Sequence, residues 1–150
     1  MFGLFKSASF QDAVLGELRG KGGYWRGSIT LAGQTVPLLM GGGKDQPDAQ
    51  AQALAQSLPA QYPVLKPVIE QALFEHYEPY AEVEDHGVPK LTAASQVWPH
   101  VRLVHVLADD VDRVMTLELG YAAAWDEEHT LGARFREGAL LELSGSVVLP

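Results

Sequence analysis

The chain has 150 residues, of which 47% are hydrophobic and 20% charged, so it is long and apolar enough for one domain with its own core. It has no cysteine, which excludes disulfides, thiolate metal sites and thiol nucleophiles and favours a cytoplasmic location. The net charge of -8 argues against nucleic acid as a partner, and no segment approaches the roughly 20 apolar residues of a membrane span.

The first third of the chain has the alternation typical of β-strands. Residues 24–31 alternate apolar and polar side chains, and residues 34–40 continue the apolar face after a turn at Ala32 and Gly33. These two segments are expected to form a hairpin. A strand over residues 13–18, joined to them through a glycine-rich turn, would complete a three-stranded meander.

The middle of the chain changes to a helical period. Residues 47–58 are rich in alanine, glutamine and leucine, and residues 62–77 place apolar side chains three and four positions apart. Because proline lacks the N–H group that a helix interior uses, Pro59 is expected to end the first helix. The sequence thus predicts two helices, then an exposed loop over residues 80–90 and a short helical turn over residues 92–98.

Four further strands are expected in the last third, over residues 101–108, 113–124, 131–136 and 139–147. Strands, then helices, then strands is the element order of an α+β domain. We therefore predict a single α+β domain over residues 1–150, with an antiparallel sheet built from the early and late strands and two central helices packed on one face. Arg134, Arg136 and Glu142 fall on the outward face, where cross-strand ion pairs would fix the register.

Sequence motifs of common catalytic sites are missing or incomplete. Gly41 to Lys44 lies between a strand and a helix, as a phosphate-binding loop does, but Asp45 stands where such a loop has serine or threonine. Neither G-x-S-x-G nor H-E-x-x-H occurs in the chain. The sequence therefore supports neither a nucleotide site nor a serine hydrolase.

Two histidines fall among apolar side chains. His76 lies on the apolar stripe of the second expected helix, and His105 alternates with Leu103 and Leu107 on a strand. Each is expected to be a core histidine that makes one hydrogen bond, and not a metal ligand.

The turn between two late strands concentrates three carboxylates and one imidazole. They belong to Asp126, Glu127, Glu128 and His129. Such groups bind divalent metals, and a histidine beside acids can serve as acid or base. Because neighbouring side chains point in different directions, convergence of more than two would need help from His100, His105 or Glu118.

Three interpretations of this turn remain open. Asp126, Glu128 and His129 bind a partner, or they hold a metal or act in catalysis, or the turn is structural. In each case Trp125 is expected to anchor the turn in the core, because the preceding strand has an apolar odd-numbered face. Asp126 and Glu127 are expected to be exposed.

The same turn carries a resemblance to a known group of proteins. Residues 125–132 follow the pattern W-D-x-E-H-x-L-G, after a strand with Trp25 and Gly27 and a segment ending in Trp98 and Pro99. This arrangement resembles an uncharacterised family of small bacterial domains that carry a W-D-x-E-H motif between two late strands. The resemblance implies an accessory or immunity-type protein, encoded near toxins and secretion systems, that binds and does not catalyse.

Acidic residues are bunched in three segments, 75–85, 109–112 and 126–128, and would attract a basic partner. The sequence therefore favours a cytoplasmic protein-interaction module, of the immunity type that the resemblance implies, which binds a basic protein and uses no cofactor. The alternative is a metal-dependent enzyme that uses the turn from Asp126 to His129. Neither a membrane nor nucleic acid is an expected partner.

Overall fold

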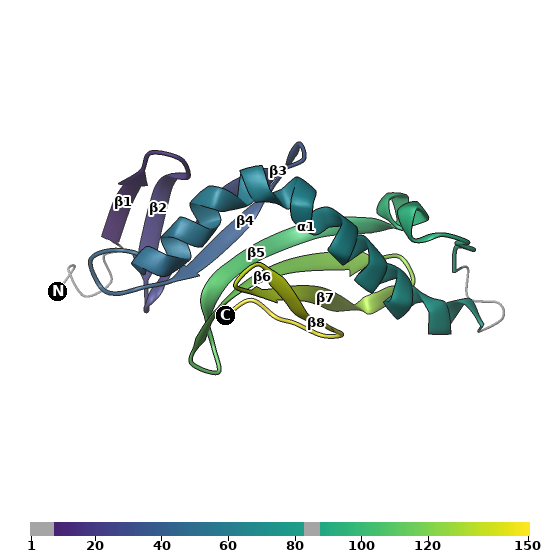
Figure 1. Cartoon of the computed structure of the whole chain (residues 1–150). Helices are drawn as coiled ribbons and strands as arrows, with labels where there is room; N and C mark the ends of the chain where they lie inside the picture. The colour runs from purple at the N-terminus through teal and green to yellow at the C-terminus, as the bar shows by residue number, and fades with distance from the viewer. Residues whose placement is uncertain (1–7, 83–87) are drawn as a thin grey trace.

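The computed structural model describes residues 8–82 and 88–150, and there it has one long helix against an eight-stranded sheet (Figure 1). The strands lie in the sheet in chain order. They are β1 (Ala8–Asp12), β2 (Gly16–Lys21), β3 (Tyr24–Leu31), β4 (Gln34–Gly41), β5 (Val101–Val111), β6 (Val114–Ala123), β7 (Asp126–Arg136) and β8 (Ala139–Ser144). The helix α1 (Ala49–Ala81) and two short 3-10 helices, η2 (Ala94–Gln96) and η3 (Trp98–His100), complete the α+β fold.

The early strands form a meander that differs from the predicted one at its start. A strand is predicted over residues 13–18, but residues 13–15 form the turn between β1 and β2. Asp12 makes this turn, because its Oδ1 accepts the N–H groups of Val14 and Leu15 at 2.8 and 2.7 Å. The predicted hairpin of β3 and β4 is confirmed, and Ala32 and Gly33 adopt positive φ at its turn.

The sheet is mixed and not wholly antiparallel. β4 and β5 run parallel, with Leu38 opposite Val106 and Met40 opposite Ala108. Every other neighbouring pair of the described strands is antiparallel. The predicted antiparallel sheet is wrong at this one pair, because a helical crossover returns the chain to the starting end of β4.

The prediction of two helices is also wrong, because α1 runs unbroken through Pro59, Pro63 and Pro67. These prolines are four residues apart and exposed, so the carbonyls of Pro59 and Pro63, which lose the donors of Pro63 and Pro67, belong to exposed residues. Asp48 caps the start of the helix through the N–H groups of residues 50 and 51. The opposite stripe of α1 is buried on the sheet: Ala51, Ala55, Leu58, Tyr62, Leu65, Ile69, Leu73 and Tyr77.

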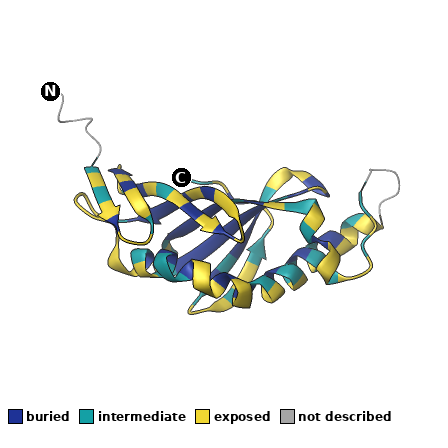
Figure 2. Cartoon of the chain, turned by 90° about the horizontal axis from the view of Figure 1, so that it is seen from above, coloured by how far each residue is buried: buried dark blue, intermediate teal, exposed yellow. Residues whose placement is uncertain are grey.

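The sheet has two faces with different covers. The helix face carries most of the core, including Trp25 and Leu119, and the hydroxyls of Tyr62 and Tyr121 meet there at 2.8 Å. Figure 2 shows the buried residues gathered on the central strands and on one side of the helix. The other face, called the second face below, is crossed by residues 145–150, of which Val147 is buried. No helix within residues 8–82 and 88–150 combines the length and apolar character of a membrane span.

Candidate functional site

The polar residues are predicted in a turn before a strand that starts at Leu131, but the structure has a turn only at residues 124–125, and β7 already starts at Asp126. A bulge distorts this start of β7, and residues 124–129 are called the β6–β7 turn below. Ala123 pairs with Asp126 and Ala122 pairs with Thr130, so residues 127–129 have no partner on β6. The bulge brings Asp126 and His129 together, with Oδ1 of the carboxylate 2.9 Å from Nδ1 of the imidazole. Of the three predicted site residues, Asp126 and His129 therefore meet, and Glu128 lies exposed beside them.

Trp125 joins this turn to the C-terminal part of α1. Its side chain is buried, as the sequence predicts, and its Nε1 donates a hydrogen bond to Nδ1 of His76 at 3.0 Å. The ring also meets Tyr77 edge-on, with the centroids 5.4 Å apart. Among the described residues His76 makes the one hydrogen bond predicted for it, but its side chain is half-buried and not in the core. Burial lowers its pKa below the ordinary histidine value.

The predicted exposure of Asp126 is wrong, because only 8% of this residue is accessible. The hydroxyl of Tyr80 donates to its Oδ2 at 3.0 Å. Burial alone would raise the pKa of Asp126, but the hydrogen bonds from His129 and Tyr80 outweigh it and hold that pKa below the ordinary value. Glu127 is exposed, as predicted.

Tyr80 is the residue of this cluster that is not predicted as part of the site, because residues 80–90 are expected to form a loop. In the structure α1 continues to Ala81, and the spacing of His76, Tyr77 and Tyr80 extends the helical stripe by one turn. That spacing is the signal that places Tyr80 on the helix. Residues 83–87 of the predicted loop lie outside the described residues.

A cleft of about 450 Å³ lies between this turn and the start of β5. Its polar lining comes from His100, Arg102, Asp126, Glu127, Glu128, His129 and Thr130. Within residues 8–82 and 88–150, no three histidine, aspartate or glutamate side chains are close enough to hold a metal ion. The cleft has mixed charge at its walls and is acidic where the turn forms its rim.

The fold gathers two of the three acid-rich segments. Four glutamates of these segments are exposed: Glu78 in the last turn of α1, Glu82 directly after the helix, and Glu127 and Glu128 on the bulge. The bond from Tyr80 to Asp126 holds the two segments side by side (Figure 1). We call these four glutamates the acidic end.

Two observations describe the electrostatics of the acidic end. Burial and the charges of Asp126 and Glu128 raise the pKa of Tyr80. The C-terminus of a helix carries a partial negative charge, and the last turn of α1 has no basic residue to neutralise it. This partial charge therefore adds to the charges of the glutamates. The third acidic segment, residues 109–112, lies at the far end of β5 and does not join the acidic end.

Comparison with known proteins identifies the family. A family model described as a domain of unknown function, DUF6985, matches residues 14–148. The chain belongs to the DUF6985 family. No curated protein and no solved structure matches it.

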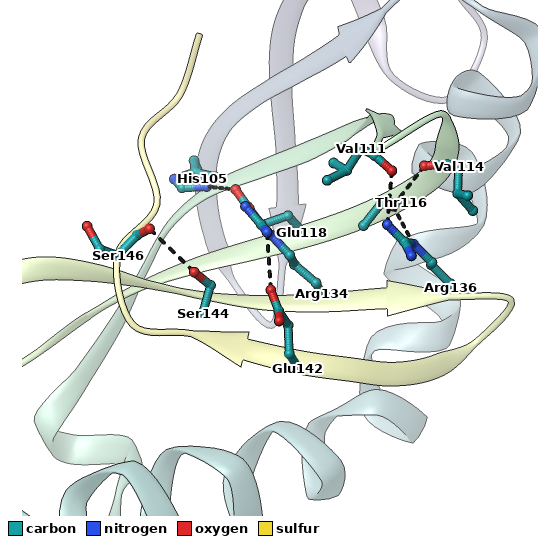
Figure 3. A network of polar contacts seen from close by, with 10 residues as sticks. All are labelled: His105, Val111, Val114, Thr116, Glu118, Arg134, Arg136, Glu142, Ser144 and Ser146. Atoms are coloured by element: carbon teal, nitrogen blue, oxygen red, sulfur yellow. Dashed lines mark hydrogen bonds and ion pairs between the residues drawn. The ribbon is translucent and has the colours of Figure 1, made fainter.

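A second polar cluster of this DUF6985 domain lies on the second face of the sheet (Figure 3). Nε2 of His105 and Oε2 of Glu118 are 2.9 Å apart, and Nε of Arg134 donates to Oε1 of Glu118 at 2.9 Å. Both His105 and Glu118 are buried. Burial alone would raise the pKa of Glu118, but the hydrogen bonds from His105 and Arg134 outweigh it and lower the pKa.

A β-bulge decides the position of His105 in the DUF6985 domain. The sequence places His105 on one face with Leu103, but the register of β5 against β6 shifts between these two residues. His105 is consequently opposite Gly120 on the second face, and its single hydrogen bond goes to Glu118.

The outward ion pair of β7 and β8 forms as predicted, with Arg134 donating to Glu142 at 3.2 Å. Arg136 instead bonds the hydroxyl of Thr116 and the carbonyl of Val111. The pair of Glu118 and Arg134 is not among the predicted ion pairs, although the alternation of β6 and β7 places both residues on one face. Neither His105 nor Glu118 lines the cleft at the turn.

Proposed function

We propose that this DUF6985 domain is a protein-interaction module that binds a basic protein through its acidic end. The observation that supports the proposal is the junction of α1 with the β6–β7 turn, where Tyr80 bonds Asp126. Because this junction brings the two segments together, the exposed acids of residues 78–82 and 127–128 can attract the same basic surface of one partner.

The cleft beside the acidic end gives such a partner a place to insert a side chain. Its rim carries Glu127 and Glu128, while Asp126 is held in one position by Tyr80 and His129. Because the carboxylate of Asp126 is already fixed and desolvated, it loses little entropy on binding. The exposed glutamates mainly steer the approach of a basic surface. Asp126 and the glutamates thus have separate roles in the proposed complex.

An immunity-type role fits this mode of binding, because the W-D-x-E-H turn lies at the acidic end. We propose that the partner is a basic protein of the same bacterial cell and that the domain works in the cytoplasm, in line with the absence of cysteine. A metal-dependent enzyme at this turn would need a third ligand beside Asp126 and His129, and no observation favours one.

The test compares two variants that remove equal charge from opposite ends of the sheet. Glu127→Gln/Glu128→Gln alters the acidic end, and Asp110→Asn/Asp112→Asn alters exposed acids at the far end of β5. Each variant and the unchanged domain are immobilised, incubated with bacterial lysate at low salt, and the retained proteins identified. We expect a basic protein on the unchanged domain, retained by the Asp variant and lost from the Glu variant. Equal retention by both variants, or an acidic protein as the retained partner, would contradict the proposal.

A further inference from the structure

The C-terminal residues 145–150 cross the second face of the sheet. Beyond β8, the N–H of Val147 donates to the carbonyl of Thr130 on β7 at 2.9 Å. Three residues later the carbonyl of Pro150 accepts a hydrogen bond from Arg26 on β3 at 3.3 Å. Because β4, β5 and β6 lie between β3 and β7, the chain between these two bonds passes over the middle of the sheet.

The path follows a row of the sheet whose two middle residues are glycines. His105, Gly120, Gly132 and Ser144 are paired neighbours across four strands. The His105 ring lies over Gly120 and Val147 lies over Gly132, where added Cβ atoms would come within 2.1 and 2.6 Å of them. The two glycines therefore make the space that the histidine and the crossing segment occupy.

The next row on this face holds a buried charge. It contains Arg26, Leu39, Leu107, Glu118, Arg134 and Glu142. Only 1% of Glu118 is exposed, and its carboxyl lies beside the position of Gly132 that Val147 covers. Since α1 packs on the opposite face, the crossing segment supplies part of the cover that keeps water from Glu118 and His105.

That cover is held by few bonds. Apart from the two described above, Ser144 donates to the carbonyl of Ser146 at 3.4 Å in an exposed position (Figure 3). Val147 is the one residue of the segment that is buried, whereas 85% of Val148 is exposed. A segment with little buried apolar surface and exposed hydrogen bonds opens more readily than the strands beneath it.

Opening of the segment leaves the partners of Glu118 in place. A closed segment removes water from the Glu118 carboxylate, and the hydrogen bonds from His105 and Arg134, which lie on the sheet itself, outweigh that loss. Opening returns water to the carboxylate without breaking either partner bond. The open arrangement is therefore accessible from the folded domain.

We propose that residues 145–150 form a strap that opens as a unit from the folded domain and exposes the Glu118 and His105 pair to solvent. The strap bonds Thr130, which also lines the cleft beside the acidic end. Its tests measure amide exchange and histidine labelling without a partner, so a failure of one proposal leaves the other standing. Val147 holds the strap in the closed position, because its side chain packs on Gly132.

Hydrogen exchange of the unchanged domain gives the first test. The N–H of Val147 is bonded to Thr130, so its exchange reports opening of the strap, while amides of β6 report opening of the whole sheet. We expect the amide of Val147 to exchange at least about ten-fold faster than protected amides of β6. Equal exchange rates for the Val147 amide and the β6 amides would show that the segment opens only with global unfolding, and the proposal of a strap would be wrong.

Labelling of histidines with diethyl pyrocarbonate, located by mass spectrometry, gives the second test. Val147→Ala removes two buried methyl groups, so His105 of this variant should react with the reagent about ten-fold faster than in the unchanged domain. In Val148→Ala, which alters an exposed side chain, His105 should react at the rate of the unchanged domain. A chain that ends at Gly145 should label His105 fastest and keep a cooperative thermal transition. Unchanged labelling of His105 in that shorter chain, or loss of its cooperative transition, would show that residues 145–150 are not a strap.

Discussion

At the scale of single residues, Trp125 contributes to stability in two ways. It buries a large ring against Tyr77 and donates a hydrogen bond to His76. Trp125→Ala should lower the free energy of unfolding by about 3–5 kcal/mol, as large aromatic truncations in cores do. Trp125→Phe keeps a ring but leaves Nδ1 of His76 without its donor, so the loss should be smaller, about 1–3 kcal/mol. Denaturant titration measures both, and a loss below about 1 kcal/mol for the alanine variant would be inconsistent with this role.

Asp12 is a buried carboxylate that fastens the β1–β2 turn to α1. Burial would raise its pKa, but hydrogen bonds from Gln52, Leu15, Gln56 and Val14 outweigh that effect and lower it from 3.8 to about 2. The folded state therefore favours the ionised form. Its stabilisation is fully present above the ordinary value of 3.8 and is lost as the pH falls to about 2.

The prediction is a pH-dependent effect of Asp12→Asn. At pH 7 the variant should lose about 2 kcal/mol of unfolding free energy relative to the unchanged domain. The difference should shrink as the pH falls below 3.8. Denaturant unfolding at a series of pH values, down to the lowest at which both chains remain folded, measures it. A difference that stays constant over this range would show that the charge of Asp12 is not responsible.

At the scale of elements, glycines on β6 and β7 decide what the second face can carry. A Cβ on Gly120 would lie 2.1 Å from Cε1 of His105, so Gly120→Ala must displace the imidazole from Glu118. We expect a loss of about 1–3 kcal/mol of unfolding free energy, the usual cost of overpacking.

Gly43→Ala is the matched control for this substitution. Gly43 has no positive φ, and the nearest atom to an added Cβ is 3.9 Å away, which is ordinary contact. Thermal melts of both variants should show a lower midpoint for Gly120→Ala alone. Equal midpoints would mean that His105 moves aside at no cost.

The helix shows how an element can override a local breaker. Pro59, Pro63 and Pro67 repeat every four residues and all face water, so the buried stripe of α1 continues past them. Burial of that stripe on the sheet outweighs the hydrogen bonds that the prolines remove. A proline pattern that repeats at helical spacing indicates a bent, continuous helix better than a boundary.

At the scale of the whole molecule, the charge of -8 is unevenly placed, and the acidic end should control the rate of association. Attraction of this kind is screened beyond about 8 Å at physiological ionic strength. Association with the basic partner should therefore slow as salt rises, while dissociation changes less. Surface plasmon resonance with the purified partner measures both rates. In Glu127→Gln/Glu128→Gln the association rate should depend less steeply on salt; an unchanged dependence would assign the steering to other acids.

Features that depend on local pattern can be read from the amino-acid sequence. Alternation identified the β3–β4 hairpin and four late strands, although not the start of β7 at Asp126 or the end of β8 at Ser144. The apolar face before the turn predicted the burial of Trp125. Absence of cysteine and the clustering of acids are compositional and needed no structure. Membership of the DUF6985 family adds no activity to these features, because the family is described as a domain of unknown function.

Features that depend on contacts between distant segments became visible only in the folded chain. Asp126 is buried because α1 extends far enough to place Tyr80 over the turn, and neither segment alone contains that information. The bulge in β5 moves His105 to the second face, and one extra residue in a strand leaves the composition and most of the alternation unchanged. The crossing of residues 145–150 over Gly132 likewise depends on space left by side chains that are absent, which becomes visible only when the strands are paired.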